Sequence, residues 1–92
     1  MTKFQLNTNY SEEELNFLKK HDCNTLCEIK LSKTNFSEYE TPRRMFQYGG
    51  AYVAEIIDDE TNDLVWAVLS KWKGVYHFSG YYDSLEALEQ GL

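Results

Sequence analysis

Apolar and polar side chains alternate along the stretch from Ala51 to Tyr82, and this period of two residues is typical of β-strands. Two short segments, Asp59 to Asn62 and Lys73-Gly74, interrupt the alternation and are rich in residues that favour turns. The pattern therefore predicts a meander of three antiparallel strands, at 51–58, 63–72 and 75–81.

A further hairpin is expected just upstream, where the segment 43–48 is followed by Gly49-Gly50. Glycine supplies the positive φ that two-residue hairpin turns require. The register of this hairpin sets Arg44 opposite Glu55, and a cross-strand pair of opposite charges favours it. The same reasoning predicts three later pairs, which are Glu55 on the same face as Trp66, Leu69 opposite Phe78, and Ser70 opposite His77.

Two short helices are predicted, one near each end of the chain. Ser11 and Glu14 have the spacing of a capping box, so a helix is expected from Ser11 to Lys20. Asp83 and Glu86 repeat this spacing and predict a second helix through Gln90. Its buried stripe is expected at Leu85, Leu88 and Leu92, with Gly91 at the C-cap.

The remaining segments are less regular. Residues 25–32 alternate, with Cys27, Ile29 and Leu31 on the apolar side, and predict one half-buried strand. Residues 1–9 are either a short edge strand or an unstructured lead. The polar segment 33–42 holds two aromatic residues, which either bind a ligand or pack the loop down.

These elements define an α+β fold: a four- to five-stranded antiparallel meander with a short N-terminal and a short C-terminal helix, in the order (β)αββββα. With 92 residues, the chain is expected to form a single domain, 1–92.

Both faces of the predicted meander are apolar, although an antiparallel sheet usually turns a polar face to solvent. One face carries Met45, Tyr52, Ala54, Ile56, Val65, Ala67, Leu69, Tyr76 and Phe78. The other carries Phe46, Tyr48, Val53, Ile57, Leu64, Trp66, Val68, Trp72 and Val75. Either the helices cover opposite faces, or the face with the two tryptophans is partly open and contacts a partner or a second copy of the chain.

The net charge is −6, and residues 49–92 carry all of it, with eight acidic and two basic side chains. This acidic half disfavours nucleic acid and anionic lipid as ligands and favours basic partners. The N-terminus has no apolar segment of a signal peptide, and no run approaches the length of a membrane span, so we expect a cytoplasmic protein with free thiols at Cys23 and Cys27.

Candidate chemistry is sparse. The acidic turn at 58–63 resembles the start of a calcium loop, but Leu64 stands where the loop needs glycine and Ser70 where it needs glutamate. His21, Cys23, Cys27 and the distant His77 could supply zinc ligands, but their spacing matches no known finger. There is no nucleophile elbow around the Ser70–His77 pair and no Gly-rich phosphate loop, so no enzyme activity, cofactor or metal is expected.

The leading hypothesis is a small non-enzymatic protein-binding module that docks on a basic surface, such as the nucleic-acid groove of a nuclease. In size and charge the chain is similar to phage-borne anti-restriction and anti-CRISPR proteins and to toxin-immunity proteins, an analogy of class that no motif supports. Carboxylates would take the place of phosphates and the tryptophans would anchor the contact. The partner-binding residues expected are Asp58, Asp59, Glu60, Asp63, Trp66, Trp72, Glu86 and Glu89.

Two alternatives belong to other classes. A nucleic-acid-binding or regulatory module would use the side that carries Arg43, Arg44, Lys71 and Lys73, with nearby aromatic rings as a stacking platform. A homodimer would instead close through the tryptophan face.

Overall fold

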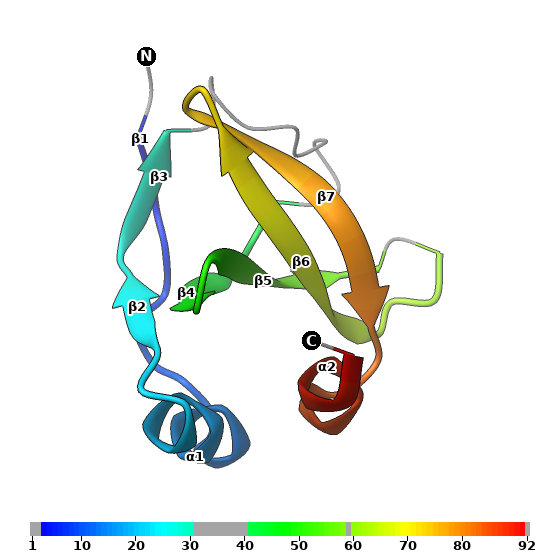
Figure 1. Ribbon diagram of the computed structural model, residues 1–92. Helices are drawn as coiled ribbons and strands as arrows, with labels where there is room; N and C mark the ends of the chain where they lie inside the picture. The colour runs from blue at the N-terminus through cyan, green and yellow to red at the C-terminus, as the bar shows by residue number, and fades with distance from the viewer. Residues whose placement is uncertain (1–2, 31–40, 59, 92) are drawn as a thin grey trace.

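The computed structural model describes residues 3–30, 41–58 and 60–91, and it shows an α+β protein with antiparallel sheets and two short helices (Figure 1). In chain order the elements are β1 (Lys3–Gln5), α1 (Glu12–Lys20), β2 (Asn24–Leu26), β3 (Glu28–Lys30), β4 (Arg44–Tyr48), β5 (Ala51–Ile57), β6 (Leu64–Trp72), β7 (Val75–Tyr82) and α2 (Leu85–Gly91).

The described strands form two sheets. The larger has five strands in the order β2-β4-β5-β6-β7, and β1 pairs with β3 in a two-stranded sheet. The α+β class and the antiparallel meander are therefore confirmed. The predicted order (β)αββββα is roughly compatible but not exact. Its optional first strand is β1, but it does not contain the second sheet, which β1 forms with β3.

The predicted register is confirmed at all three hairpins. Arg44 pairs with Glu55, Glu55 with Trp66, and Leu69 with Phe78, and Ser70 lies opposite His77. An irregularity between Val68 and Leu69 then shifts the β6–β7 ladder, so that Trp66 lies opposite Tyr82. A bulge of this kind has no strong sequence signal, and it sets which residues of β7 reach the start of β6.

The prediction of a single strand over residues 25–32 is wrong. The chain bends at Cys27 and divides into β2, which pairs with β4, and β3, which pairs with β1. Because of the bend, Cys27 is exposed, while Ile29 is buried and Leu26 packs against the same core. For residues 1–9, the strand alternative holds: Phe4 and Leu6 pack into that core from β1 and the segment after it.

Helix α1 begins as the capping box predicts. The Ser11 hydroxyl accepts a hydrogen bond from the Glu14 backbone, and the Glu14 carboxylate accepts one from the Ser11 backbone. At the other end, the Cys23 N–H donates to the Leu18 carbonyl at 2.9 Å, and Asp22 has a φ of 52°. This is the Schellman arrangement, in which a residue in the left-handed region ends the helix.

Replacing Asp22 by glycine is expected to stabilise the fold by about 0.5–1 kcal/mol, because glycine has no Cβ to strain a positive φ and the change removes a negative charge from the helix C-terminus. The free energy of unfolding in urea measures this gain. Asp22→Asn is the matched control, since asparagine tolerates the left-handed region and removes only the charge. If Asp22→Gly destabilises the fold, Asp22 does not end α1 in the left-handed conformation.

Helix α2 begins one residue later than predicted. The Ser84 hydroxyl, and not the Asp83 carboxylate, accepts the backbone N–H of Ala87 at 3.1 Å, so Asp83 and Glu86 do not form a capping box. Gly91 lies within α2 and not at a C-cap. Position 91 requires a residue without a side chain because of packing, since a Cβ there would lie 2.5 Å from the hydroxyl oxygen of Tyr82.

The two faces of the larger sheet carry separate apolar cores. The first face packs against Leu6, Ile29 and Phe4, which belong to the segments of the small sheet. The second face packs against Phe17 and Leu18 of α1 and against Leu85 and Leu88 of α2. Both helices therefore cover the same face, the one with Trp66, and not opposite faces (Figure 1).

Some predictions lie outside the described residues: those for Leu31, for the loop from 33 to 40, for Asp59 and for Leu92. Among the helices that the structure does describe, none is long and apolar enough to cross a membrane.

Candidate functional site

At one end of the larger sheet, β5 ends, β6 begins and β7 leads into α2 (Figure 1). Acidic residues are concentrated on these segments. We call this region the acidic end and define it by Asp58, Glu60, Asp63, Asp83 and Glu86. All of these side chains are exposed except that of Asp58, which is half-buried.

The turn between β5 and β6 is held by its own polar groups. The Asp58 carboxylate accepts a hydrogen bond from the backbone N–H of Glu60 at 2.9 Å. The backbone carbonyl of Asp58 accepts one from the N–H of Asn62 at 2.7 Å. Asn62 has a φ of 62°, which asparagine tolerates. Asp58 therefore shapes the turn, and the side chains of Glu60 and Asp63 are exposed, where a partner can reach them.

A hollow of about 580 Å³ opens beside this turn. Its described lining is Asp58, Thr61, Asp63, Leu64, Val65 and Asp83. Carboxylates around a partly apolar floor suit the long side chain of a lysine or arginine, because the floor packs against the methylene groups while a carboxylate pairs with the charge.

Asp83 also lines this hollow, although the sequence pattern predicts that it caps a helix. It lies directly after β7, and the pairing of Trp66 with Tyr82 brings it beside the start of β6. The register of the β6–β7 hairpin could have placed Asp83 beside the start of β6, but only if the position of the bulge had been known.

Glu89, in contrast, belongs to a local ion cluster. Its carboxylate lies 2.9 Å from His21 Nε2 and 3.0 Å from Lys20 Nζ, so α2 is tied to the end of α1. The hydrogen bonds from His21 and Lys20 lower the pKa of Glu89. Its charge is therefore largely balanced within the molecule and contributes less to an acidic surface than the sequence implies.

The two tryptophans lie in different environments and do not form one surface. Trp66 is only 7% exposed beneath the helices, and its indole N–H donates to Glu14 Oε2 at 3.4 Å. Trp72 is 66% exposed and lies at the opposite end of β6. Trp66 therefore offers no ring to a partner in this structure, and a homodimer through an open tryptophan face lacks that face.

Two carboxyl groups lie side by side inside the protein, which the sequence did not indicate. Glu14 is 2% exposed and Glu55 is 1% exposed. Arg44 Nη1 donates to Glu55 Oε1 at 2.6 Å, and Arg44 Nε donates to the Asn9 carbonyl. In the described part of the chain, no group donates a hydrogen bond to the buried Glu55 Oε2, which disfavours a negative charge on that oxygen. The protonated Glu55 carboxyl can instead donate to Glu14.

The two buried carboxyl groups have opposite pKa shifts. Burial, together with the neighbouring Glu14 carboxyl, raises the pKa of Glu55 from its ordinary 4.5 to about 7, although Arg44 opposes this. Burial also acts to raise the pKa of Glu14, but hydrogen bonds from Glu55, Ser11 and Trp66 outweigh it and lower this pKa. Below about pH 7 the pair therefore holds one proton and one negative charge, which balances the charge on Arg44.

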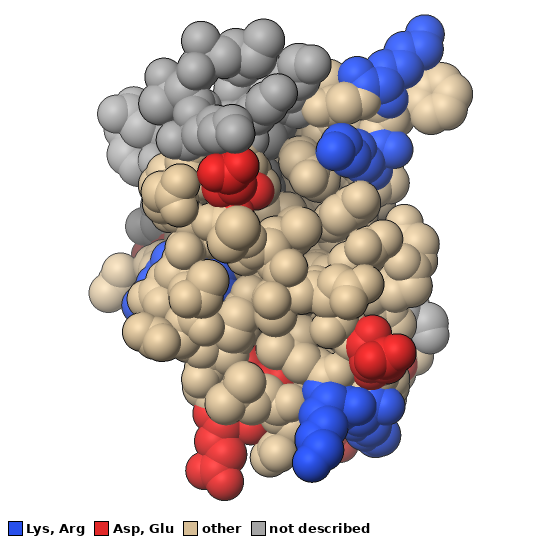
Figure 2. All heavy atoms as spheres, turned by 90° about the vertical axis from the view of Figure 1, so that its left-hand side faces the viewer, with Lys and Arg blue, Asp and Glu red and all other residues tan. Residues whose placement is uncertain are grey.

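The basic residues named in the nucleic-acid alternative are not brought together. Arg44 is committed to Glu55 and Asn9, and Arg43 lies 3.9 Å from the same Glu55 carboxylate. Lys71 and Lys73 lie at the far end of β6. Seen from the side of the small sheet, the surface carries a few basic and acidic groups around a broad uncharged area (Figure 2). No continuous basic strip forms on this face.

The described residues that could bind zinc or act in catalysis do not form a cluster either. Within the described residues, no group of three or more His, Cys, Asp or Glu side chains is placed to hold a metal ion. His21 is engaged by Glu89 and its ring lies 4.9 Å from that of Tyr48, and Cys27 is exposed. Ser70 and His77 are cross-strand neighbours, as predicted.

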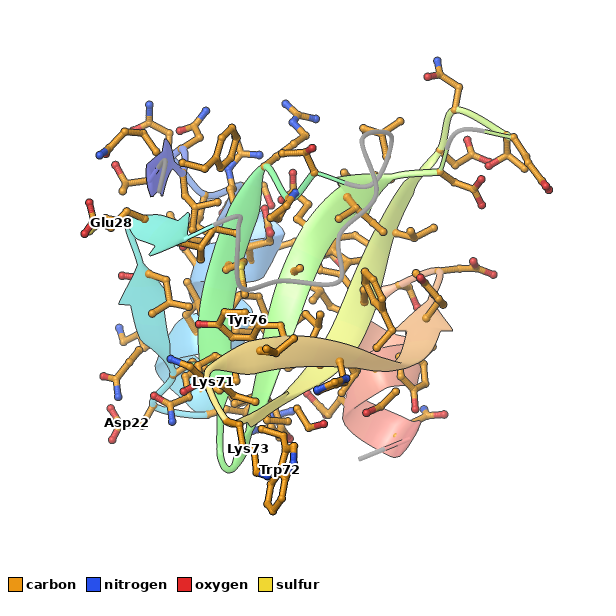
Figure 3. The ribbon with its side chains drawn as sticks, turned by 90° about the horizontal axis from the view of Figure 1, so that it is seen from above. Asp22, Glu28, Lys71, Trp72, Lys73 and Tyr76 are labelled. Atoms are coloured by element: carbon orange, nitrogen blue, oxygen red, sulfur yellow. The ribbon has the colours of Figure 1, made fainter. Side chains whose placement is uncertain are left out.

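A second exposed feature lies at the hairpin between β6 and β7. We call Lys71, Trp72 and Lys73 the basic tip. Lys73 Nζ lies 5.7 Å from the ring centre of Trp72, and Lys71 Nζ lies 5.3 Å from that of Tyr76. Viewed from above, Trp72 and Lys73 project from the end of the hairpin, away from the sheet (Figure 3).

No protein-family model, curated protein or solved structure matches this chain, so the acidic end and the basic tip are interpreted from their own geometry.

Proposed function

We propose that this protein is a small non-enzymatic protein-binding module whose acidic end docks on a basic surface of another protein, as an inhibitor or immunity-type protein would. The nucleic-acid-binding groove of a nuclease is the kind of surface that fits. The observation that carries the proposal is the hollow that Asp58, Asp63 and Asp83 line, with a partly apolar floor.

Charge and position both support this assignment. The exposed carboxylates of the acidic end would take the place of phosphates against a basic groove, and complementary potential speeds association and excludes acidic partners. Relative to the sequence-based set, Asp83 joins the site and Trp66 leaves it because it is buried. Trp72 also leaves the site because it lies at the opposite end of β6. Glu89 contributes little because Lys20 and His21 pair with it.

The test is affinity capture from cell lysate with three baits. The first is the wild type and the second carries Asp63→Lys and Asp83→Lys at the acidic end. The third carries Asp22→Lys and Glu28→Lys, which change the net charge equally but lie away from the turn between β5 and β6 (Figure 3). Circular dichroism of each bait verifies folding.

The wild type and the third bait are expected to retain the same nucleic-acid-binding proteins, and the second bait is expected to lose them. Their retention should fall at least tenfold between about 0.05 M and 0.5 M salt, because exposed charges are screened over a few ångströms at high salt. Duplex DNA should release them by competition. Capture that is equal with all three baits, or that DNA leaves unchanged, would refute the proposal.

A further inference from the structure

The basic tip exposes a large aromatic ring beside a cation, since Lys73 Nζ lies 5.7 Å from the ring centre of Trp72. Trp72 is 66% exposed, and it projects from the end of the β6–β7 hairpin (Figure 3). Exposing a ring of this size is unfavourable unless something covers it, and tryptophan is the residue type that most often anchors a protein contact.

The backbone of the tip is unusual in a second respect. Lys73 has a φ of 51° and Gly74 a φ of 80°, which is a two-residue turn of the type that favours Asn-Gly. A lysine at the first position strains the backbone, since its Cβ is disfavoured at positive φ. A single substitution to asparagine would relieve this strain. A strained residue that is kept in place of such a substitute is typical of a position where the side chain has a function.

We propose that the basic tip of one molecule docks in the hollow at the acidic end of a second copy of the same chain. The two surfaces are complementary in charge and in polarity. In the proposed contact, Lys71 and Lys73 would meet the three aspartates, and the indole of Trp72 would cover the smaller apolar part of the lining, which Leu64 and Val65 supply.

The contact cannot form within one molecule. The tip and the hollow lie at opposite ends of β6, which at about 3.3 Å per residue separates them by roughly 27 Å. The views from the side and from above agree that the β6–β7 hairpin and the β5–β6 turn point away from each other (Figures 1 and 3). A contact of two different surfaces repeats head to tail, so successive copies add in a chain or close into a ring.

The association should be weak and sensitive to salt. A three-residue tip covers far less than the ~1,200 Å² of a stable interface, so dissociation constants in the range of about 10 µM to 1 mM are expected. This inference does not depend on the proposed function. If both hold, a basic partner and a second copy compete for the same hollow.

The decisive experiment uses two defective variants and sedimentation velocity. The tip variant carries Lys71→Glu and Trp72→Ala, and the hollow variant carries Asp63→Lys and Asp83→Lys. Each alone is expected to stay monomeric at about 1 mM, whereas wild type should show a mass that rises with concentration and falls at about 0.5 M salt. Mixed at equal amounts, the two variants should form a dimer and nothing larger, because each supplies the one surface that the other lacks.

Lys73→Asn separates association from folding. It is expected to stabilise the hairpin, since asparagine suits the positive φ, and yet to weaken self-association about threefold or more by removing one cation. Wild type that is monomeric at about 1 mM, a mixture that stays monomeric, or a tip variant that self-associates would each overturn the proposal. The tip variant leaves the acidic end intact, so its capture of a basic partner should match wild type, and a failure here does not affect the proposed function.

Discussion

Glu55→Gln is expected to raise the free energy of unfolding by about 1–3 kcal/mol at pH 8 and to change it little at pH 5. Glu55 is 1% exposed beside Glu14, and its pKa is raised to about 7. Above that pH the cluster holds two buried negative charges, with Arg44 as the close counter-charge and the half-exposed Arg43 at 3.9 Å as a weaker one. A tenfold change in an acid dissociation constant corresponds to about 1.4 kcal/mol. Glutamine keeps the acceptor for Arg44 and places an N–H where Glu55 Oε2 has no partner.

The sign follows from which state binds the proton. The unfolded chain releases the Glu55 proton near 4.5, whereas the folded protein holds it until about 7. Between these values the folded state binds more protons, so this group makes wild type progressively less stable as the pH rises through the window. Glu14 has a lowered pKa, so its contribution to stability is lost only as the pH falls below its unfolded value, outside this window. Glutamine does not titrate, and the difference between the two proteins therefore opens between pH 4.5 and 7.

Urea unfolding at a series of pH values from about 5 to 8 measures this difference, because the dependence on pH reports the protons that each state binds. Glu60→Gln is the matched control, since it makes the same chemical change at an exposed position and should alter stability by less than about 0.5 kcal/mol at every pH. A Glu55→Gln effect that is constant with pH, or destabilising at pH 8, would show that Glu55 is ionised across the range.

The local features of this chain were predictable because they depend on residues close in sequence. The capping box at Ser11 needs only a hydroxyl and a carboxylate three residues apart, and each hairpin register follows from the length of its turn. The face assignment of the meander follows from that register. These rules were sufficient to place Arg44, Glu55 and Trp66 in one row across three strands.

What the sequence did not reveal depends on distant packing. An alternating pattern over residues 25–32 does not show that the chain bends at Cys27 to join two sheets. Nor does the net charge of −6 show where the charge lies: Glu14 and Glu55 are buried and Glu89 is paired, so the acidic surface is smaller than the composition suggests and more concentrated at one end. Burial of Trp66 likewise depends on both helices choosing the same face.

Leu88→Ala is expected to cost about 3 kcal/mol of unfolding free energy, within the range of 2–5 kcal/mol for a buried leucine. Leu88 is fully buried in the core that α2 shares with Trp66. Helix α2 spans only Leu85–Gly91, and a helix of two turns is unstable alone, so its docking on the sheet is what maintains it. Gln90→Ala on the exposed side of α2 is the control and should change stability by less than about 0.5 kcal/mol.

The same variant tests whether the second face of the sheet is structural or open for contact. In a Trp72→Phe background Trp66 is the only tryptophan, so its emission reports on the cover that α1 and α2 provide. Loosening α2 by Leu88→Ala should admit water to this indole and shift its emission to longer wavelength before the protein unfolds. If Leu88→Ala costs less than about 1 kcal/mol and leaves the emission unchanged, α2 is not docked there. The face that carries Trp66 would then be available to a partner, and the acidic end would not be the only strong candidate for the binding site.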